Sequence, residues 1–239
     1  KVIMTELTLP IIGYMRSPYK EKFGIPRQPN LVQVESFIEM IAPYNELSAF
    51  EGIEAFSHLW LLWQFHDNKN QQDKAKFRPQ VRPPRLGGNQ KIGVFATRSM
   101  YRPAPIGLSV VQLKNVKKVG QSVRVYVTGS DLLDGTPIVD IKPYIQYSDS
   151  VIDAQSGYAQ YEPERKKIIW TESAELVKNQ FMKMQKMNAQ YINELEQVLS
   201  LDPRPAYQRD DARIYGLSFG EFNIKFTCNE DSVFIQMIE

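Results

Sequence analysis

The chain has little of the residues from which disulfides and metal sites are built. Among its 239 residues there are one cysteine and two histidines. The single Cys228 excludes an intramolecular disulfide and a cysteine-built metal centre, and it is typical of a reducing compartment. His58 and His66 form no H-x-H or H-E-x-x-H pattern, so we expect no zinc site. We therefore predict a cytoplasmic protein without a metal.

Long apolar runs and the common phosphate-binding motifs are missing too. The longest apolar run, Leu59 to Trp63, is too short to span a bilayer, and the first nine residues lack the apolar core of a secretory signal. The chain contains no G-x-G-x-x-G, P-loop or G-x-S-x-G motif. This argues against a Rossmann-type fold, a P-loop NTPase and the serine hydrolases with that motif. We expect a globular protein outside the membrane.

Acidic residues are absent from one segment that is rich in basic ones. Between residues 74 and 102 there are eight basic residues and no Asp or Glu, which leaves 21 of the 29 Lys and Arg residues against 27 acidic ones elsewhere. A basic segment on an acidic body suits a polyanion such as nucleic acid. A solvated charged loop is the other interpretation. The basic residues are Lys74, Lys76, Arg78, Arg82, Arg85, Lys91, Arg98 and Arg102.

The basic segment ends in A-T-R-S-M-Y-R-P-A-P-I-G-L-S, residues 96 to 109. Pro103, Pro105 and Gly107 restrict its backbone, and Arg98 and Arg102 place two delocalised cations beside it. Such a loop suggests a ligand that carries a carboxylate or another anionic group. A rigid loop with solvated or salt-bridged arginines is the alternative.

Short β-rich runs separated by Pro and Gly dominate the first two thirds of the chain. Their spacing favours a β-barrel or a sandwich over a doubly wound parallel sheet. We therefore predict a mainly β fold. The predicted strands are Leu9–Met15, Leu31–Glu39, Phe56–Phe65, Ile92–Thr97, Leu108–Val116 and Val123–Thr128.

After about residue 150 the pattern becomes helical and then returns to strands. Ser173 is a candidate N-cap for a helix that reaches Leu199, and Met182, Met184 and Met187 are expected to pack on its apolar face. Asp202-Pro203-Arg204-Pro205 ends that helix. A hairpin is predicted from 222–227 and 233–238, with Cys228 as a small buried residue. We expect a small α+β domain here.

Four loop segments combine polar side chains with unusual backbone. Each is weak evidence alone, because Asp-Gly and Gly-Thr-Pro are ordinary turn sequences and a histidine at a strand end is often structural. The segments are Ser17 to Asn30, Phe65 to Asn68, Arg85 to Asn89, and Gly129 to Pro137 with Asp140 beyond it.

Taken together, an ordered set of motifs resembles the TsaA-like family, and within it the TrmO-type tRNA (adenine-N6)-methyltransferases. Met100, Tyr101 and Ala104 depart from the family form, which has Pro, Phe and Asn there. The motifs are P-R-Q-P (26–29), E-G-I-E-x-F-S-H-L-W (51–60), R-P-P-R-L-G-G-N (82–89), G-V-F-A-T-R-S (93–99), R-P-x-P-I-G-L-S (102–109), D-L-L-D-G-T-P-I-x-D-I-K-P-Y (131–144), D-P-R-P-A-Y (202–207) and F-G-E-F-N-I-K-F (219–226).

The resemblance implies a β-barrel methyltransferase that uses S-adenosyl-L-methionine, with a catalytic domain at residues 1–152 and a C-terminal domain at 153–239. It implies a homodimer that N6-methylates N6-threonylcarbamoyladenosine beside the anticodon of threonine tRNA. The implied cofactor-binding residues are Pro26, Arg27, Gln28, His66, Asp67, Arg98, Leu108, Asp131, Leu132, Leu133 and Asp134.

The chemistry requires a proton acceptor, because an N6 that carries a carbonyl substituent must lose a proton to be methylated. Asp131, Asp134 and His66 are the candidate catalytic residues, with Asp67 as a further candidate for the same role. Arg82, Arg85, Lys91 and Arg102 are candidates for tRNA binding. Two alternatives stay open: a non-catalytic RNA-binding module, and a methyltransferase of this fold that acts on another nucleoside or a small molecule.

Overall fold

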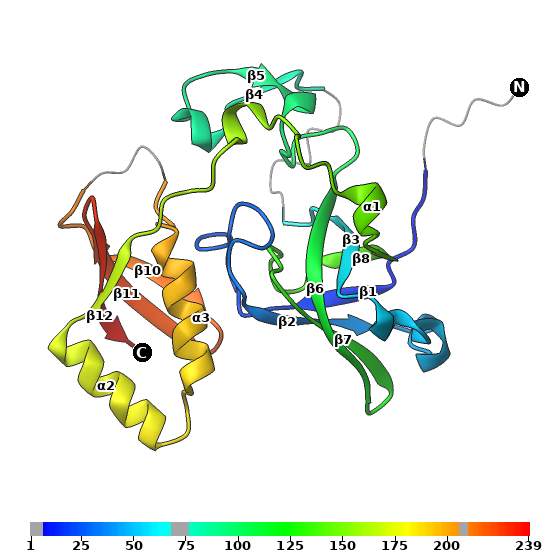
Figure 1. Cartoon of the computed structure of the whole chain (residues 1–239). Helices are drawn as coiled ribbons and strands as arrows, with labels where there is room; N and C mark the ends of the chain where they lie inside the picture. Colours follow the sequence, from blue (N-terminus) through cyan, green and yellow to red (C-terminus); the bar gives the residue numbers. More distant parts are fainter. Residues whose placement is uncertain (1–6, 68–76, 206–209) are drawn as a thin grey trace, which may run out of the picture.

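A closed antiparallel β-barrel forms the N-terminal part of the computed structural model, which describes residues 7–67, 77–205 and 210–239 (Figure 1). The strands follow the order β1-β2-β7-β6-β3-β8 around the barrel. Alternating side chains point into it, as along β3, where Leu59, Leu61 and Trp63 are buried. The barrel strands are β1 (Gly13–Arg16), β2 (Glu35–Met40), β3 (His58–Gln64), β6 (Ile106–Val119), β7 (Ser122–Thr128) and β8 (Pro137–Pro143).

Between β3 and β6 the chain leaves the barrel and forms a small ladder, β4 (Gln80–Val81) with β5 (Ile92–Gly93). Figure 1 shows this β4–β5 unit above the barrel. The predicted strand at 92–97 is wrong beyond Gly93, because the chain turns into a 3-10 helix where Thr97 Oγ1 donates to the Val94 carbonyl, 2.7 Å away. Short helices in this part of the chain are η1 (Leu47–Phe50), η2 (Ile53–Ala55), η4 (Pro84–Leu86), η5 (Val94–Ala96), α1 (Gln146–Asp149) and η6 (Gly157–Ala159).

The C-terminal part is a four-stranded sheet covered on one side by two helices (Figure 1). The strand order is β10-β11-β12-β9, with β9 parallel to β12 and the other pairs antiparallel. The hairpin of β11 and β12 matches the prediction, and Cys228 is fully buried in it. The elements are β9 (Lys167–Trp170), α2 (Glu172–Lys183), α3 (Ala189–Ser200), β10 (Tyr215–Phe219), β11 (Phe222–Cys228) and β12 (Ser232–Ile238).

The single predicted helix is in fact two. Thr171, not Ser173, caps α2 by accepting a hydrogen bond from Ala174 N, and Gln185, with a φ of +56°, ends the helical path. Asn188 starts α3 by accepting from Tyr191 N at 2.8 Å. Of the three methionines expected in the core, Met187 is buried, but Met182 and Met184 are exposed at the end of α2. Because the chain breaks at Gln185, a single helical period over this stretch does not describe the apolar faces of both helices.

The segment between β1 and β2 contributes to the core of the C-terminal part, whereas the interior of the barrel is a separate core. Tyr19, Val32 and Val34 from the segment between β1 and β2 pack with the buried residues of the C-terminal sheet and of α3. The Tyr19 and Phe219 rings lie 5.9 Å apart, and the Glu35 backbone N–H donates to Glu194 on α3, 3.0 Å away. The segment between Tyr19 and β2 therefore packs against the C-terminal part before the chain enters the barrel.

Two absences hold for the described ranges only. No helix there has the length and apolar character needed to cross a membrane. Nor does any group of three or more His, Cys, Asp or Glu side chains in those ranges have a metal-binding arrangement.

Candidate active site

A cavity of about 480 Å³ opens at the end of the barrel where β3 ends and β6 begins. This volume lies in the range of small-molecule sites. Four segments far apart in the chain line it: 22–28, 63–67, 97–108 and 131–136. Three of the loop segments named from the sequence, together with the 96–109 motif, therefore meet at one place.

A chain of three hydrogen-bonded side chains forms one wall of the cavity. The Trp63 indole N–H donates to Ser109 Oγ at 3.0 Å, and Ser109 Oγ donates to Asp131 Oδ1 at 2.7 Å. Trp63 and Ser109 are adjacent because β3 and β6 pair antiparallel, and both side chains are buried. The buried indole and hydroxyl thus hold the Asp131 carboxylate in one orientation.

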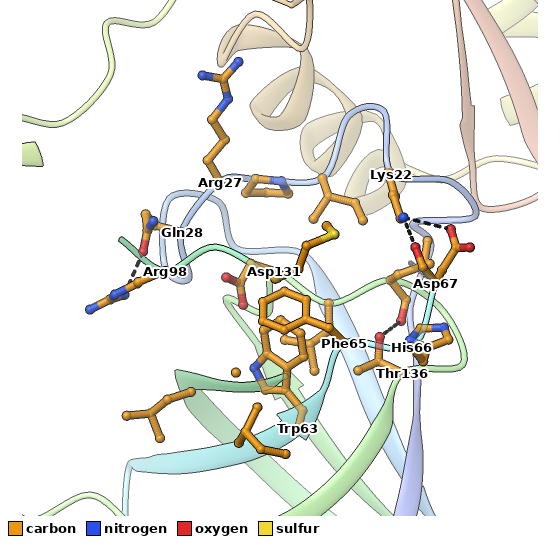
Figure 2. A pocket seen from close by; sticks show the side chains of 18 of the residues that line it. Lys22, Arg27, Gln28, Trp63, Phe65, His66, Asp67, Arg98, Asp131 and Thr136 are labelled. Atoms are coloured by element: carbon orange, nitrogen blue, oxygen red, sulfur yellow. Dashed lines mark hydrogen bonds and ion pairs between the residues drawn. The ribbon is translucent and has the colours of Figure 1, made fainter. Parts of the chain in front are cut away.

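Asp131 is electrostatically unusual. Its carboxyl group is packed against protein, and this desolvation raises its pKa from 3.8 to about 6, against the opposing effects of the Ser109 hydrogen bond and the Arg98 charge. Figure 2 shows the carboxylate between the Phe65 ring and the Gln28–Arg98 pair. A carboxylate with this pKa is mostly ionised at neutral pH, yet it is a stronger base than an exposed aspartate.

Charged and polar groups form the rim. Arg98 Nη1 donates to Gln28 Oε1 at 2.7 Å, and Lys22 Nζ lies 3.3 Å from Asp67 Oδ2 (Figure 2). Desolvation of the ring lowers the pKa of His66, which favours its neutral form at pH 7. The rim therefore offers cations, a carboxylate and a neutral imidazole around an aromatic wall.

The shape of the 96–109 motif has a clear local cause. Arg102 Nη1 donates to the Thr97 carbonyl at 2.9 Å and closes the loop on itself. At Gly107 a side chain would place its Cβ 2.2 Å from the Trp63 ring, so only glycine permits this packing. Arg102 thus supports the loop while also lining the cavity, and Gly107 sets the position of Trp63.

The structure brings together ten of the residues named as cofactor-binding. All ten line the cavity, although the Arg27 side chain extends away from the other labelled groups (Figure 2). Their assignment to the cofactor stays a prediction. The ten are Pro26, Arg27, Gln28, His66, Asp67, Arg98, Leu108, Asp131, Leu132 and Leu133.

Asp134 is placed elsewhere. Its carboxylate accepts from Ser17 N at 3.0 Å and pairs with Lys20 Nζ at 2.9 Å, beside a second, more open cavity. The turn at Gly135, with a φ of +79°, directs it away from Asp131. Its contacts connect the 131–136 loop to the segment after β1, and Asp134 does not line the first cavity.

Of the residues named for tRNA binding, Arg102 lines the cavity, whereas Arg82, Arg85 and Lys91 are exposed on the β4–β5 unit. Lys74, Lys76, Asn68 and the end of the D-P-R-P-A-Y motif lie outside the described residues.

From the sequence, Phe65, Met100 and Ser109 were named only as parts of candidate segments, and Trp63 was given no role at the site. All but Ser109 line the cavity, and Ser109 lies directly behind it. One signal was available. Ser109 stands in the apolar run L-S-V-V at an inward-facing position, and a buried hydroxyl requires a partner. The sequence could not show that this partner is Asp131.

Comparisons with known proteins give the same family for both parts of the chain. The family model of the tRNA-methyltransferase O N-terminal domain matches residues 14–150, and that of the TrmO C-terminal domain matches residues 163–239. A tRNA (adenine(37)-N6)-methyltransferase of Escherichia coli is 46% identical over 218 residues, which cover 90% of each chain.

Two further relatives extend the comparison. A Pseudomonas aeruginosa protein named as an S-adenosylmethionine-dependent methyltransferase is 43% identical over 223 residues, covering 92% of each chain. A crystal structure of TrmO from Pseudomonas aeruginosa superposes with a TM-score of 0.79 at 33% identity, covering 99% of each chain.

Proposed function

This chain belongs to the TrmO family of S-adenosylmethionine-dependent tRNA methyltransferases, and from that premise we propose that it N6-methylates N6-threonylcarbamoyladenosine beside the anticodon of threonine tRNA. The observation that carries the proposal is the Asp131 carboxylate, oriented by Ser109 at a cavity of about 480 Å³ and with its pKa raised to about 6.

The residues of the cavity fit S-adenosylmethionine. That cofactor combines a flat adenine, ribose hydroxyls, a sulfonium cation, an ammonium and a carboxylate. Trp63, Phe65 and Leu108 offer apolar and aromatic surface for the adenine, and Arg98 offers a fork for the carboxylate. Asp67 offers a negative group for the ammonium or the ribose.

When bound at these residues, S-adenosylmethionine would supply a methyl group that its sulfonium activates for transfer to nitrogen. The protein then has to position the acceptor nitrogen and remove its proton. We assign the proton to Asp131 Oδ, because this group is ionised at neutral pH, is desolvated and is held by Ser109. His66, neutral at pH 7 and on the same cavity, is the second candidate.

The cellular setting and assembly belong to the same proposal. We propose a cytoplasmic homodimer with a catalytic domain at 1–152 and a C-terminal domain at 153–239. The extents of the two matched family models and the separate core of the barrel support this division. Arg82, Arg85 and Lys91 are exposed on the β4–β5 unit, where they are available to phosphates of the tRNA.

Mass spectrometry of tRNA nucleosides tests the proposal. Threonine tRNA from cells that lack the protein is incubated with the purified protein and S-adenosylmethionine, alongside a different tRNA that also carries the threonylcarbamoyl nucleoside. We expect that nucleoside to gain one methyl group in threonine tRNA and far less in the second tRNA. An unmethylated nucleoside in both would refute the function, and equal methylation would refute the threonine specificity alone.

A non-catalytic RNA-binding module is disfavoured by the intact cavity. Its ten predicted cofactor residues lie together, and Asp131 retains its positioning partners. Equilibrium binding of S-adenosylmethionine separates the two, since a module without a working cavity shows none.

A further inference from the structure

Five exposed aromatic side chains lie on the β4–β5 unit (residues 77–102) and on the linker (residues 150–166) that is hydrogen-bonded to it through Arg85 and Ala96. Within the described residues, Phe77, Phe95 and Tyr161 have 54%, 71% and 81% of their surface exposed. Tyr101 and Tyr158 are exposed nearby. These five residues are called the aromatic surface below. The cavity does not account for them, since none of the five lines it.

Main-chain contacts hold the aromatic surface together. Pairing of β4 with β5, and the hydrogen bond from Val94 N to the Pro79 carbonyl at 2.9 Å, bring Phe77 beside Phe95. Their ring centroids are 6.1 Å apart with an interplanar angle of 29°. Tyr158 is joined to the same unit through the Ala96 carbonyl. The aromatic surface is therefore a folded feature rather than a set of unrelated loop residues.

Tyr161 joins through the Arg85 guanidinium, which donates to its carbonyl. One cation of the unit contacts a ring, and others are exposed on the same unit. Arg78 lies over the Tyr101 ring at 5.6 Å, and Arg82 and Lys91 are exposed on the same unit. No Asp or Glu occurs in the sequence from residue 77 to 102, whereas Glu162 and Glu164 follow Tyr161 on the linker. Stacked, exposed rings among cations are what proteins use to bind unpaired nucleotides.

The aromatic surface adjoins the cavity along the chain. Phe95 precedes the cavity residue Arg98 by three positions, a span of at most about 11 Å. Tyr101 stands between Met100 and Arg102, which both line the cavity. A nucleotide next to one inserted in the cavity can thus reach these rings.

We propose that the aromatic surface stacks unpaired bases that flank the methylated nucleoside in the anticodon loop. This inference rests on the proposed function. A second copy of the chain is the competing occupant. Two copies that met through this same face would bring like charges together, whereas RNA phosphates complement the cations of residues 77–102.

Equilibrium binding of threonine tRNA to the full-length protein tests the proposal with Phe95→Leu, which keeps apolar volume but loses the ring. Phe95→Trp keeps a stacking face, and Tyr44→Leu is the control, an exposed aromatic after β2. Loss of one stack predicts roughly 5- to 100-fold weaker binding for Phe95→Leu and near-normal binding for Phe95→Trp and Tyr44→Leu. The KM for tRNA should rise, with the KM for S-adenosylmethionine unchanged.

Salt dependence and sedimentation complete the test. Phe95→Leu should lower affinity equally at every salt concentration, whereas Arg82→Gln should flatten the salt dependence. Normal tRNA binding by Phe95→Leu would overturn the inference, as would a shift of its sedimentation to a smaller species, which would make the surface a contact between copies. Failure of the proposed function would give a different result, because the unaltered protein would then methylate no tRNA.

Discussion

Replacing Ser109 by alanine tests the assigned role of Asp131. The change removes the hydroxyl that donates to Asp131 Oδ1 at 2.7 Å and stabilises its ionised form. A hydrogen bond to a charged group contributes about 1.5–3 kcal/mol. Since one pKa unit corresponds to about 1.4 kcal/mol, the pKa of Asp131 should rise by about 1–2. It would move from about 6 to roughly 7–8.

The assay is the pH dependence of the single-turnover methylation rate with saturating S-adenosylmethionine and tRNA. A base must be ionised to accept a proton, so the rate falls as pH drops through its pKa. The acid limb of Ser109→Ala should therefore shift upward by about 1–2 pH units, with a rate at pH 6 about 5- to 50-fold below that of the unaltered protein and little change at pH 9.

Three controls make the result specific. Ser109→Thr keeps the hydroxyl and should restore the profile. Ser36→Ala removes another buried hydroxyl on a barrel strand, one without a hydrogen-bond partner, and should leave the profile unchanged. In Ser109→Ala the Trp63 indole N–H loses its acceptor, which should lower the free energy of unfolding by about 1–3 kcal/mol. Thermal unfolding measures this loss. An acid limb that does not move in Ser109→Ala would refute the reasoning and point to His66 instead.

Three further predictions follow from the same cavity. Folding raises the pKa of Asp131 from 3.8 to about 6, so its ionised form destabilises the fold above pH 6 and not below pH 4. Asp131→Asn should therefore raise the free energy of unfolding by up to about 3 kcal/mol at pH 8 but little at pH 4, as denaturant titrations will measure. The same variant should abolish methylation. Gly107→Ala should displace Trp63, costing about 1–3 kcal/mol of stability and weakening S-adenosylmethionine binding in calorimetry, whereas Gly216→Ala, whose nearest neighbour is 3.8 Å away, should do neither. Arg98→Lys should weaken binding of the cofactor about tenfold in the same calorimetric assay, because an ammonium cannot reproduce a planar fork, and equal affinity would reduce Arg98 to a structural role in its loop.

Much of the barrel was predictable because its strands alternate in a simple period. Val123–Thr128 and the core of Leu108–Val116 agree with β7 and β6. The strand β8 was missed because Gly135 and Pro137 read as turn residues, although the strand starts directly at that proline. Local pattern also could not show that β9 pairs parallel with β12, because that contact joins segments more than sixty residues apart.

Motifs distributed over nearly the whole chain were enough to identify the family, the cofactor class and many of the residues that meet at the cavity. The distinction between Asp131 and Asp134 came from the folded structure. The two aspartates lie three residues apart, and nothing in the sequence distinguishes their roles. In the structure, Asp134 bonds to Ser17 and Lys20 next to the turn at Gly135, whereas Asp131 lies beside Ser109. The reason is physical: a carboxylate becomes a useful base through desolvation and a fixed hydrogen-bond partner, and both come from strands brought together by folding.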